Sequence, residues 1–201
     1  MAYGGFKISE KRIMRKFNLV ILLTIFTGCG PLYPLFAGGP YKGKVIDAET
    51  KAPIVGAVVL AVWYRGAPGL GHASHGFLDA EEVLTDKSGE FVIGAHPPAS
   101  LIPGTWVEGP RITIFYPNYG YFPRYQIAPR QPPGGYKGLL AEMEKRAVNF
   151  ELPPLKTLKE KREGMRLVDP AEVPNEKKPK LNKLINQQRR ELGLEAVYPE
   201  K

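Results

Sequence analysis

The sequence predicts an all-β protein: a seven-stranded β-sandwich followed by a helical, partly disordered C-terminal tail. Three observations lead to this fold class. Between residues 41 and 155, short runs rich in Val, Ile and aromatic residues alternate with turns, as they do in β-sandwiches. The chain has 22 glycines and 20 prolines among 201 residues, which favours turns over long helices. After residue 155 the sequence becomes rich in charged residues, which sets the tail apart.

The clearest strand signals are short apolar runs, and together with the turns between them they suggest about seven strands. The runs lie at 42–47, 54–64, 82–85, 90–93, 111–116 and 147–152. The sharpest turn is Asp86–Gly89, because Gly89 can adopt the positive φ that a tight hairpin needs. Trp63 and Phe91 are expected in the core. Trp106 lies in a Gly/Pro-rich segment, which predicts a loop.

The first 28 residues have the pattern of an export signal. Lys11, Arg12, Arg15 and Lys16 precede an apolar run of eight residues, 19–26. About 20 apolar residues are needed to cross a bilayer, so this run fits the short apolar region of a signal peptide instead. Small residues then lead to Cys29, the one cysteine of the chain.

The segment that ends in Gly28-Cys29 resembles the lipobox of bacterial lipoproteins. That resemblance implies cleavage before Cys29 and acylation of its thiol with palmitate-type chains, so that a membrane lipid anchor holds the protein. Residue 30 is Gly rather than Asp, which in Gram-negative families implies the outer membrane. The alternative is an ordinary buried cysteine near the start of a domain. On the lipoprotein interpretation, residues 1–28 are the signal peptide and residues 29–40, rich in Pro and Gly, are a tether.

The charge of the chain is concentrated at its two ends. The net charge is +8, yet residues 29–155 hold eleven basic and eleven acidic side chains. The excess therefore belongs to the signal segment and to the tail, residues 156–201. A basic patch on the folded part would favour nucleic-acid binding; this distribution does not, and no nucleic-acid partner is expected.

Several short motifs in the predicted sandwich, residues 41–155, resemble a known domain family. They are Gly43-Lys44-Val45-Ile46-Asp47, Pro53-Ile54, Gly56-Ala57-Val58-Val59 and Thr85–Phe91. These residues are similar to the carboxypeptidase regulatory-like domain. The resemblance implies a transthyretin-like (prealbumin-like) sandwich that serves as an accessory module, with no catalytic residues and no cofactor.

The segment 65–81 is a candidate metal site. It contains His72 and His75, with Asp79 close behind, and His96 lies beyond the next predicted hairpin. Imidazole and carboxylate groups suit zinc and similar ions. The same histidines on a glycine-rich loop can equally be solvated and bind nothing. A metal-binding protein or metal-dependent enzyme is therefore the alternative function.

Four tyrosines form a second candidate site, for a ligand: Tyr116, Tyr119, Tyr121 and Tyr125. Exposed rings on loops can stack on sugars or peptides. The other interpretation is that the rings pack under their loop and cover the end of the sandwich.

The tail is expected to form two helices, at 155–168 and 179–194. In the second helix Leu181, Leu184, Ile185 and Leu192 fall near one face. That face must be covered by its own domain, by a partner or by a membrane surface. The whole sequence predicts a cell-envelope lipoprotein, anchored through Cys29, whose domain is a non-catalytic binding or scaffold module for an envelope protein or glycan.

Overall fold

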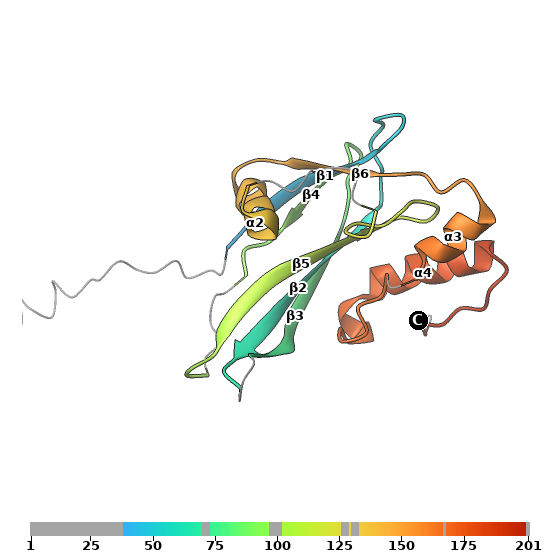
Figure 1. Cartoon of the computed structure of the whole chain (residues 1–201). Helices are drawn as coiled ribbons and strands as arrows, with labels where there is room; N and C mark the ends of the chain where they lie inside the picture. Colours follow the sequence, from blue (N-terminus) through green and yellow to red (C-terminus); the bar gives the residue numbers. More distant parts are fainter. Residues whose placement is uncertain are drawn as a thin grey trace, which may run out of the picture. The chain divides into compact units, whose positions relative to one another are not determined.

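The computed structural model describes residues 38–69, 73–96, 102–125, 129, 133–166 and 168–199. The strands and helices of this part of the chain are arranged as in Figure 1. The strands are β1 (Tyr41–Asp47), β2 (Val58–Ala67), β3 (Ser74–Leu84), β4 (Glu90–Ile93), β5 (Trp106–Phe115) and β6 (Val148–Leu152). The helices are α2 (Gly135–Lys145), α3 (Leu158–Gly164), the 3₁₀ helix η1 (Asn175–Lys177) and α4 (Pro179–Glu191).

The described strands form two three-stranded sheets. The first has the order β4-β1-β6 and the second β3-β2-β5. β1 pairs antiparallel with β4 but parallel with β6, whereas the second sheet is antiparallel throughout. A parallel partner cannot be reached through a hairpin, and the chain enters β6 from α2. The prediction of a seven-stranded, all-β sandwich is therefore wrong: the described residues form six strands, and the domain is mixed α/β.

Helix α2 lies within residues 41–155, the segment predicted to form the all-β sandwich. Its apolar residues Leu139 and Met143 are one turn apart, and they are only 2% and 0% exposed. They enter the same core as the first sheet. The chain turns into the helix at Gly134, whose φ of 90° is rarely adopted by other residues. The spacing of Leu139 and Met143 signals a helix, but the glycines around it favour a loop.

The two sheets share one apolar core. β2 contributes Val59, Ala61 and Trp63, which alternate along the strand and so point to one side. They meet Phe91 and Phe150 of the first sheet. The ring of Phe150 lies 5.8 Å from that of Phe91 and 5.0 Å from that of Phe122, centroid to centroid. A Cβ at Gly43 would lie 2.4 Å from the Phe91 ring, so a glycine is needed there.

The opposite face of the second sheet carries a second core. Val58, Leu60 and Val62 of β2 point to this side and pack with Leu181 and Ile185 of α4. β2 is therefore covered on both faces, by the first sheet and by the tail. This explains why its first seven residues are all buried. A strand that is buried on both faces reads as a continuous apolar run, as 54–64 does in the sequence.

Polar contacts fasten the tail to the second sheet. The carboxylate of Glu82 on β3 accepts hydrogen bonds from the backbone N–H groups of Lys180 (2.8 Å) and Leu181 (2.8 Å) at the start of α4. The hydroxyl of Tyr64 on β2 donates to Glu172 at 2.6 Å. Burial raises the pKa of Tyr64, and the carboxylate of Glu172 raises it further. These contacts join residues about 100 positions apart in the chain.

The two expected tail helices are present as α3 and α4. α3 begins with a capping box, in which Thr157 and Glu160 satisfy each other's backbone N–H groups. It ends at Gly164, earlier than expected, whereas Pro179 is the first residue of α4, as predicted. The apolar face of α4 is covered by the domain's own sheet, one of the three alternatives. None of the helices in the described ranges has the length and apolar character needed to span a bilayer.

Candidate functional site

Two groups of candidate residues fall partly or wholly outside the described ranges. Cys29 and the signal segment before it lie outside them, and so does His72. Of the candidate residues, the structure therefore shows the surroundings of His75, His96 and the four tyrosines.

The four tyrosines pack against the two apolar cores. Tyr116 and Tyr119 lie against the core between the sheets, whereas Tyr121 and Tyr125 belong to the core beneath the tail. The Tyr119 hydroxyl donates to Asp47 at 2.8 Å. Burial and that carboxylate together raise the pKa of Tyr119 to about 12. Each ring therefore packs on protein, two in the core between the sheets and two in the core beneath the tail. Ligand binding by the four tyrosines stays a prediction.

The two described histidines contact different carboxylates. His75 Nδ1 lies 3.1 Å from Glu108 Oε2, and His96 Nε2 lies 3.4 Å from Asp79 Oδ2. His75 and Asp79 are four residues apart on β3, which in a strand is about 13 Å. His96 also stacks on Trp63, with ring centroids 4.3 Å apart. Within the described ranges, no three His, Cys, Asp or Glu side chains are close enough to hold a metal ion.

A different group of side chains converges at the far end of the second sheet. We call it the Trp106 patch: Gly66, His75, Trp106 and Glu108. Gly66 of β2 pairs with His75 of β3 on one side and with Trp106 of β5 on the other. Glu108 is two residues from Trp106, so both side chains leave the same face of β5.

The Trp106 ring lies against the backbone of Gly66. A Cβ at position 66 would lie 2.3–2.7 Å from three atoms of the indole, so any other residue would displace the ring. The indole N–H donates to Glu108 Oε1 at 2.6 Å, while the other oxygen of that carboxylate is the one near His75. This chain of contacts fixes the plane of the ring. Trp106 nevertheless remains 40% exposed, so part of its surface is open to solvent.

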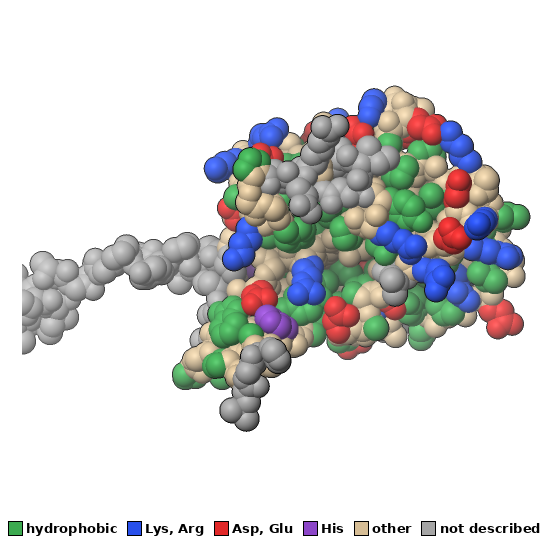
Figure 2. All heavy atoms as spheres, viewed as in Figure 1, with side chains coloured by type: hydrophobic (Ala, Val, Ile, Leu, Met, Phe, Trp, Pro, Cys, Tyr) green, Lys and Arg blue, Asp and Glu red, His purple; other side chains and the backbone are tan. Residues whose placement is uncertain are grey.

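A backbone irregularity places Trp106 and Glu108. The register of β5 against β2 shifts between Val62 and Tyr64, where Gly109 adopts a φ of 117°. A bulge of this kind re-aims the residues beyond it, here the outer end of β5. In Figure 2 a histidine and an acidic side chain are exposed side by side at the end of the domain that β2, β3 and β5 form. The patch therefore presents an aromatic surface with polar groups along one edge.

Such an arrangement suits recognition of a sugar. The open ring surface can accept the apolar C–H groups of a pyranose, and the carboxylate and imidazole at its edge can hydrogen-bond to hydroxyls. Sites of this type combine aromatic surface with a few placed polar groups. The four residues of the patch include no Ser, Thr, Cys or Lys side chain.

Comparisons with known protein families, curated proteins and solved structures find no match to this chain. The motifs that resemble the carboxypeptidase regulatory-like domain have physical roles of their own. The Asp86 carboxylate accepts hydrogen bonds from the backbone N–H groups of Ser88 and Glu90, and these bonds lower its pKa. Gly89 has a φ of 76°, as the predicted turn requires. Phe91 is 4% exposed, which confirms its place in the core.

The sequence pattern does not reveal the Trp106 patch, because it predicts loops for both halves. The later strand is predicted from residue 111, whereas β5 begins at Trp106, and a loop is predicted at 65–81, where β3 begins at Ser74. The glycines and prolines of these segments favoured loops. The signal that was available is the spacing of two between Trp106 and Glu108, which puts them on one face of a strand.

Proposed function

We propose that this protein is an exported lipoprotein, anchored in the outer membrane by acyl chains on Cys29, and that its folded domain is a non-catalytic binding module. The observation that carries the proposal is the order of segments before residue 29: basic residues, a short apolar run, then Gly28-Cys29. The Pro- and Gly-rich residues 30–40 suit a tether. Two or more acyl chains suffice for stable anchoring, because each buried CH₂ contributes about 0.8 kcal/mol.

We further propose that the ligand of the module is an envelope glycan and that the Trp106 patch binds it. The exposed indole supports this, because the geometry around Gly66 and Glu108 holds it in a fixed plane. A fixed ring binds with a smaller loss of side-chain entropy than a free one.

The anchor is tested by growing cells with a fatty-acid analogue and comparing the wild type with Cys29→Ser. The wild-type protein is expected to carry the label and to sediment with membranes, and Cys29→Ser is expected to lose both properties. Ala141→Ser, an exposed change on α2, is the control and should keep both. Equal labelling of wild type and Cys29→Ser would refute the anchor.

The ligand surface is tested by co-sedimentation with purified peptidoglycan and by titration with soluble N-acetylglucosamine oligomers. Trp106→Ala is expected to weaken binding about fivefold or more, since a stacked aromatic contact contributes on the order of 1 kcal/mol. Trp106→Phe keeps an aromatic face and should retain part of the affinity. The control is Ile102→Ala, whose side chain is also half exposed. Unchanged binding by Trp106→Ala would rule out the patch as the ligand site.

A further inference from the structure

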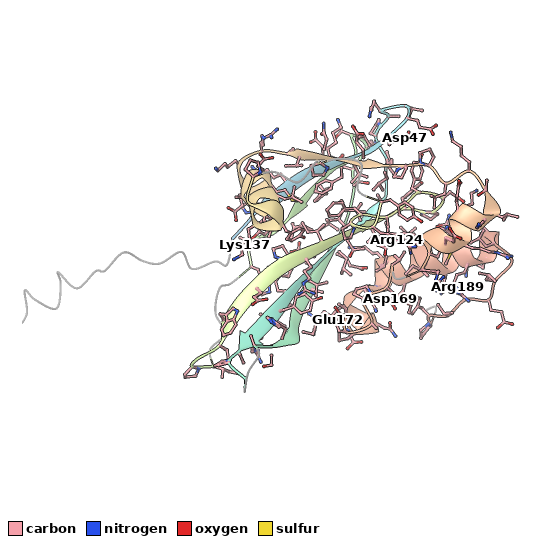
Figure 3. The ribbon with its side chains drawn as sticks, viewed as in Figure 1. Asp47, Arg124, Lys137, Asp169, Glu172 and Arg189 are labelled. Carbon is pink, nitrogen blue, oxygen red and sulfur yellow. The ribbon has the colours of Figure 1, made fainter. Side chains whose placement is uncertain are left out.

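A cavity in the tail is lined by three arginines. It has a volume of about 560 Å³ and lies between α3, the residues after α3, α4 and the C-terminal segment. We call it the arginine pocket, after Arg162, Arg166 and Arg189. Figure 2 shows Lys and Arg side chains gathered over α3 and α4, and Figure 3 shows where Arg189 and Asp169 lie. Apolar side chains complete the lining: Met165, Ile185, Leu194 and Val197.

The charge of these arginines is not balanced by nearby acids. Among the described residues, no carboxylate forms an ion pair with Arg162, Arg166 or Arg189. Asp169 also lines the pocket, but its carboxylate already binds the ammonium of Lys178 and the hydroxyl of Tyr198. Lys178 is buried and Asp169 is partly exposed, and the negative charge of Asp169 is matched by the positive charge of Lys178 rather than by an arginine. The pocket therefore has an excess positive charge.

A different arginine, Arg124, caps the carbonyl end of α3. The carbonyl oxygens of Glu163 and Arg166 accept hydrogen bonds from the Arg124 guanidinium, at 3.2 and 2.9 Å. Arg124 thus caps the end of α3 and brings a fourth cation near the pocket. Arg189 is held in place by a 2.6 Å hydrogen bond from its Nε to the carbonyl of Glu195, which uses one of its five N–H donors. Its remaining donors are available to a ligand.

A second, larger cavity in the tail has a smaller excess of positive charge. It has a volume of about 640 Å³, and Glu176 lines it together with Lys183, Arg190 and asparagines. A carboxylate among two cations lowers the attraction for an anion. The arginine pocket is thus the more cationic of the two.

We infer that the arginine pocket binds a phosphate group. Guanidinium groups bind phosphate through paired N–H donors, and several of them around one cavity favour an oxyanion with more than two acceptor oxygens. The apolar lining beside the cations fits a ligand whose phosphate is joined to a hydrophobic part. The phosphate can belong to a lipid headgroup or to a soluble phosphate ester, and the chemistry in the pocket is the same.

The test uses the full chain carrying Cys29→Ser, so that acyl chains make no contribution. Its binding is measured to phosphatidylglycerol vesicles, to phosphatidylcholine vesicles and to glycerol 3-phosphate. The variant Arg162→Gln/Arg166→Gln/Arg189→Gln is compared with Arg146→Gln/Lys44→Gln/Lys87→Gln, a control with the same charge change at sites remote from the tail. Circular dichroism establishes that each variant is folded.

We expect a phosphate probe to bind, and the pocket variant to lose about tenfold or more in affinity while the control retains it. Binding to phosphatidylglycerol that glycerol 3-phosphate does not displace identifies a lipid as the source. Binding of glycerol 3-phosphate with no preference between the vesicles identifies a soluble ester. The inference is overturned if neither phosphate probe binds, or if the pocket variant binds as well as the control. Trp106→Ala should leave phosphate binding unchanged, which separates this site from the proposed glycan site.

Discussion

The two faces of the second sheet are covered in different ways. Toward the first sheet, the contact consists of interlocking apolar side chains such as Trp63, Phe91 and Phe150. Toward the tail, an apolar strip is bordered by charged contacts from Glu82 and Glu172 and by the ion pair of the buried Lys178 with the partly exposed Asp169. The contribution of the first face to the free energy of unfolding should therefore depend mainly on the volume of its buried side chains. The contribution of the second face should depend on pH and salt as well, because both affect charged contacts.

The largest expected effect is that of removing a ring from the core between the sheets. Phe150→Ala is expected to lower the free energy of unfolding by about 3–5 kcal/mol, because a fully buried phenyl group is lost and a cavity remains. Urea denaturation measures this, with the exposed Val92→Ala of the same sheet as the control. The effect should be the same at pH 7 and at pH 3.5. If this loss of unfolding free energy depended strongly on pH, the expected difference between the two faces of the second sheet would be contradicted.

A smaller and more local effect is expected on the tail side. Leu181→Ala removes a fully buried side chain from α4 and should lower the free energy of unfolding by about 2–5 kcal/mol. Amide hydrogen exchange should rise in the tail helices before it rises in β1 and β6, since the mutation weakens only one face. Leu158→Ala, with a side chain 64% exposed, is the control. Uniform faster exchange over the whole domain would show that the two faces are not separable.

The smallest expected effect is that of one hydrogen bond, and it depends on pH. Tyr64→Phe removes the donor to Glu172 and should cost about 1 kcal/mol at pH 7. The hydrogen bond from Tyr64 holds the pKa of Glu172 below its ordinary value of 4.5. That stabilisation is present above this value and is lost as the pH falls through the lowered pKa.

The difference in the free energy of unfolding between wild type and Tyr64→Phe should consequently shrink as the pH falls below 4.5. Urea denaturation at several pH values measures it, and the other carboxylates cancel because both proteins contain them. Tyr119→Phe, which breaks the bond to Asp47, is a comparison away from the tail. A difference that stays constant with pH would mean that Glu172 is not the group that responds.

Local features of this fold could be predicted, and features that join distant segments could not. The turn at Asp86–Gly89, the core position of Phe91 and the start of α4 at Pro179 follow from short-range backbone and side-chain rules. The parallel pairing of β1 with β6 depends on residues about 100 positions apart, and no local pattern encodes it. Helix α2 was not predicted, because three glycines shortly precede its first buried residue and favour a loop.

The candidate sites were harder to predict for the same reason. The exposed state of Trp106 depends on Gly66, which lies on another strand. The excess charge of the arginine pocket depends on Asp169 being engaged by Lys178 and Tyr198. Burial of a lysine is rare unless a partner is supplied, and here the partner and the tyrosine come from separate segments. Composition showed a basic tail but not which cations lack a counter-charge.

The capping of α4 by Glu82 has a consequence for the order in which the protein folds. Lys178, at the N-cap position of α4, makes no side-chain capping bond, and the helix has 13 residues, a length at which isolated helices are marginal in water. The backbone N–H groups of Lys180 and Leu181 find their acceptor only on β3. A peptide of residues 156–201 alone should therefore be largely unfolded, and α4 should form only after the second sheet is in place. The arginine pocket would then be assembled only after the second sheet.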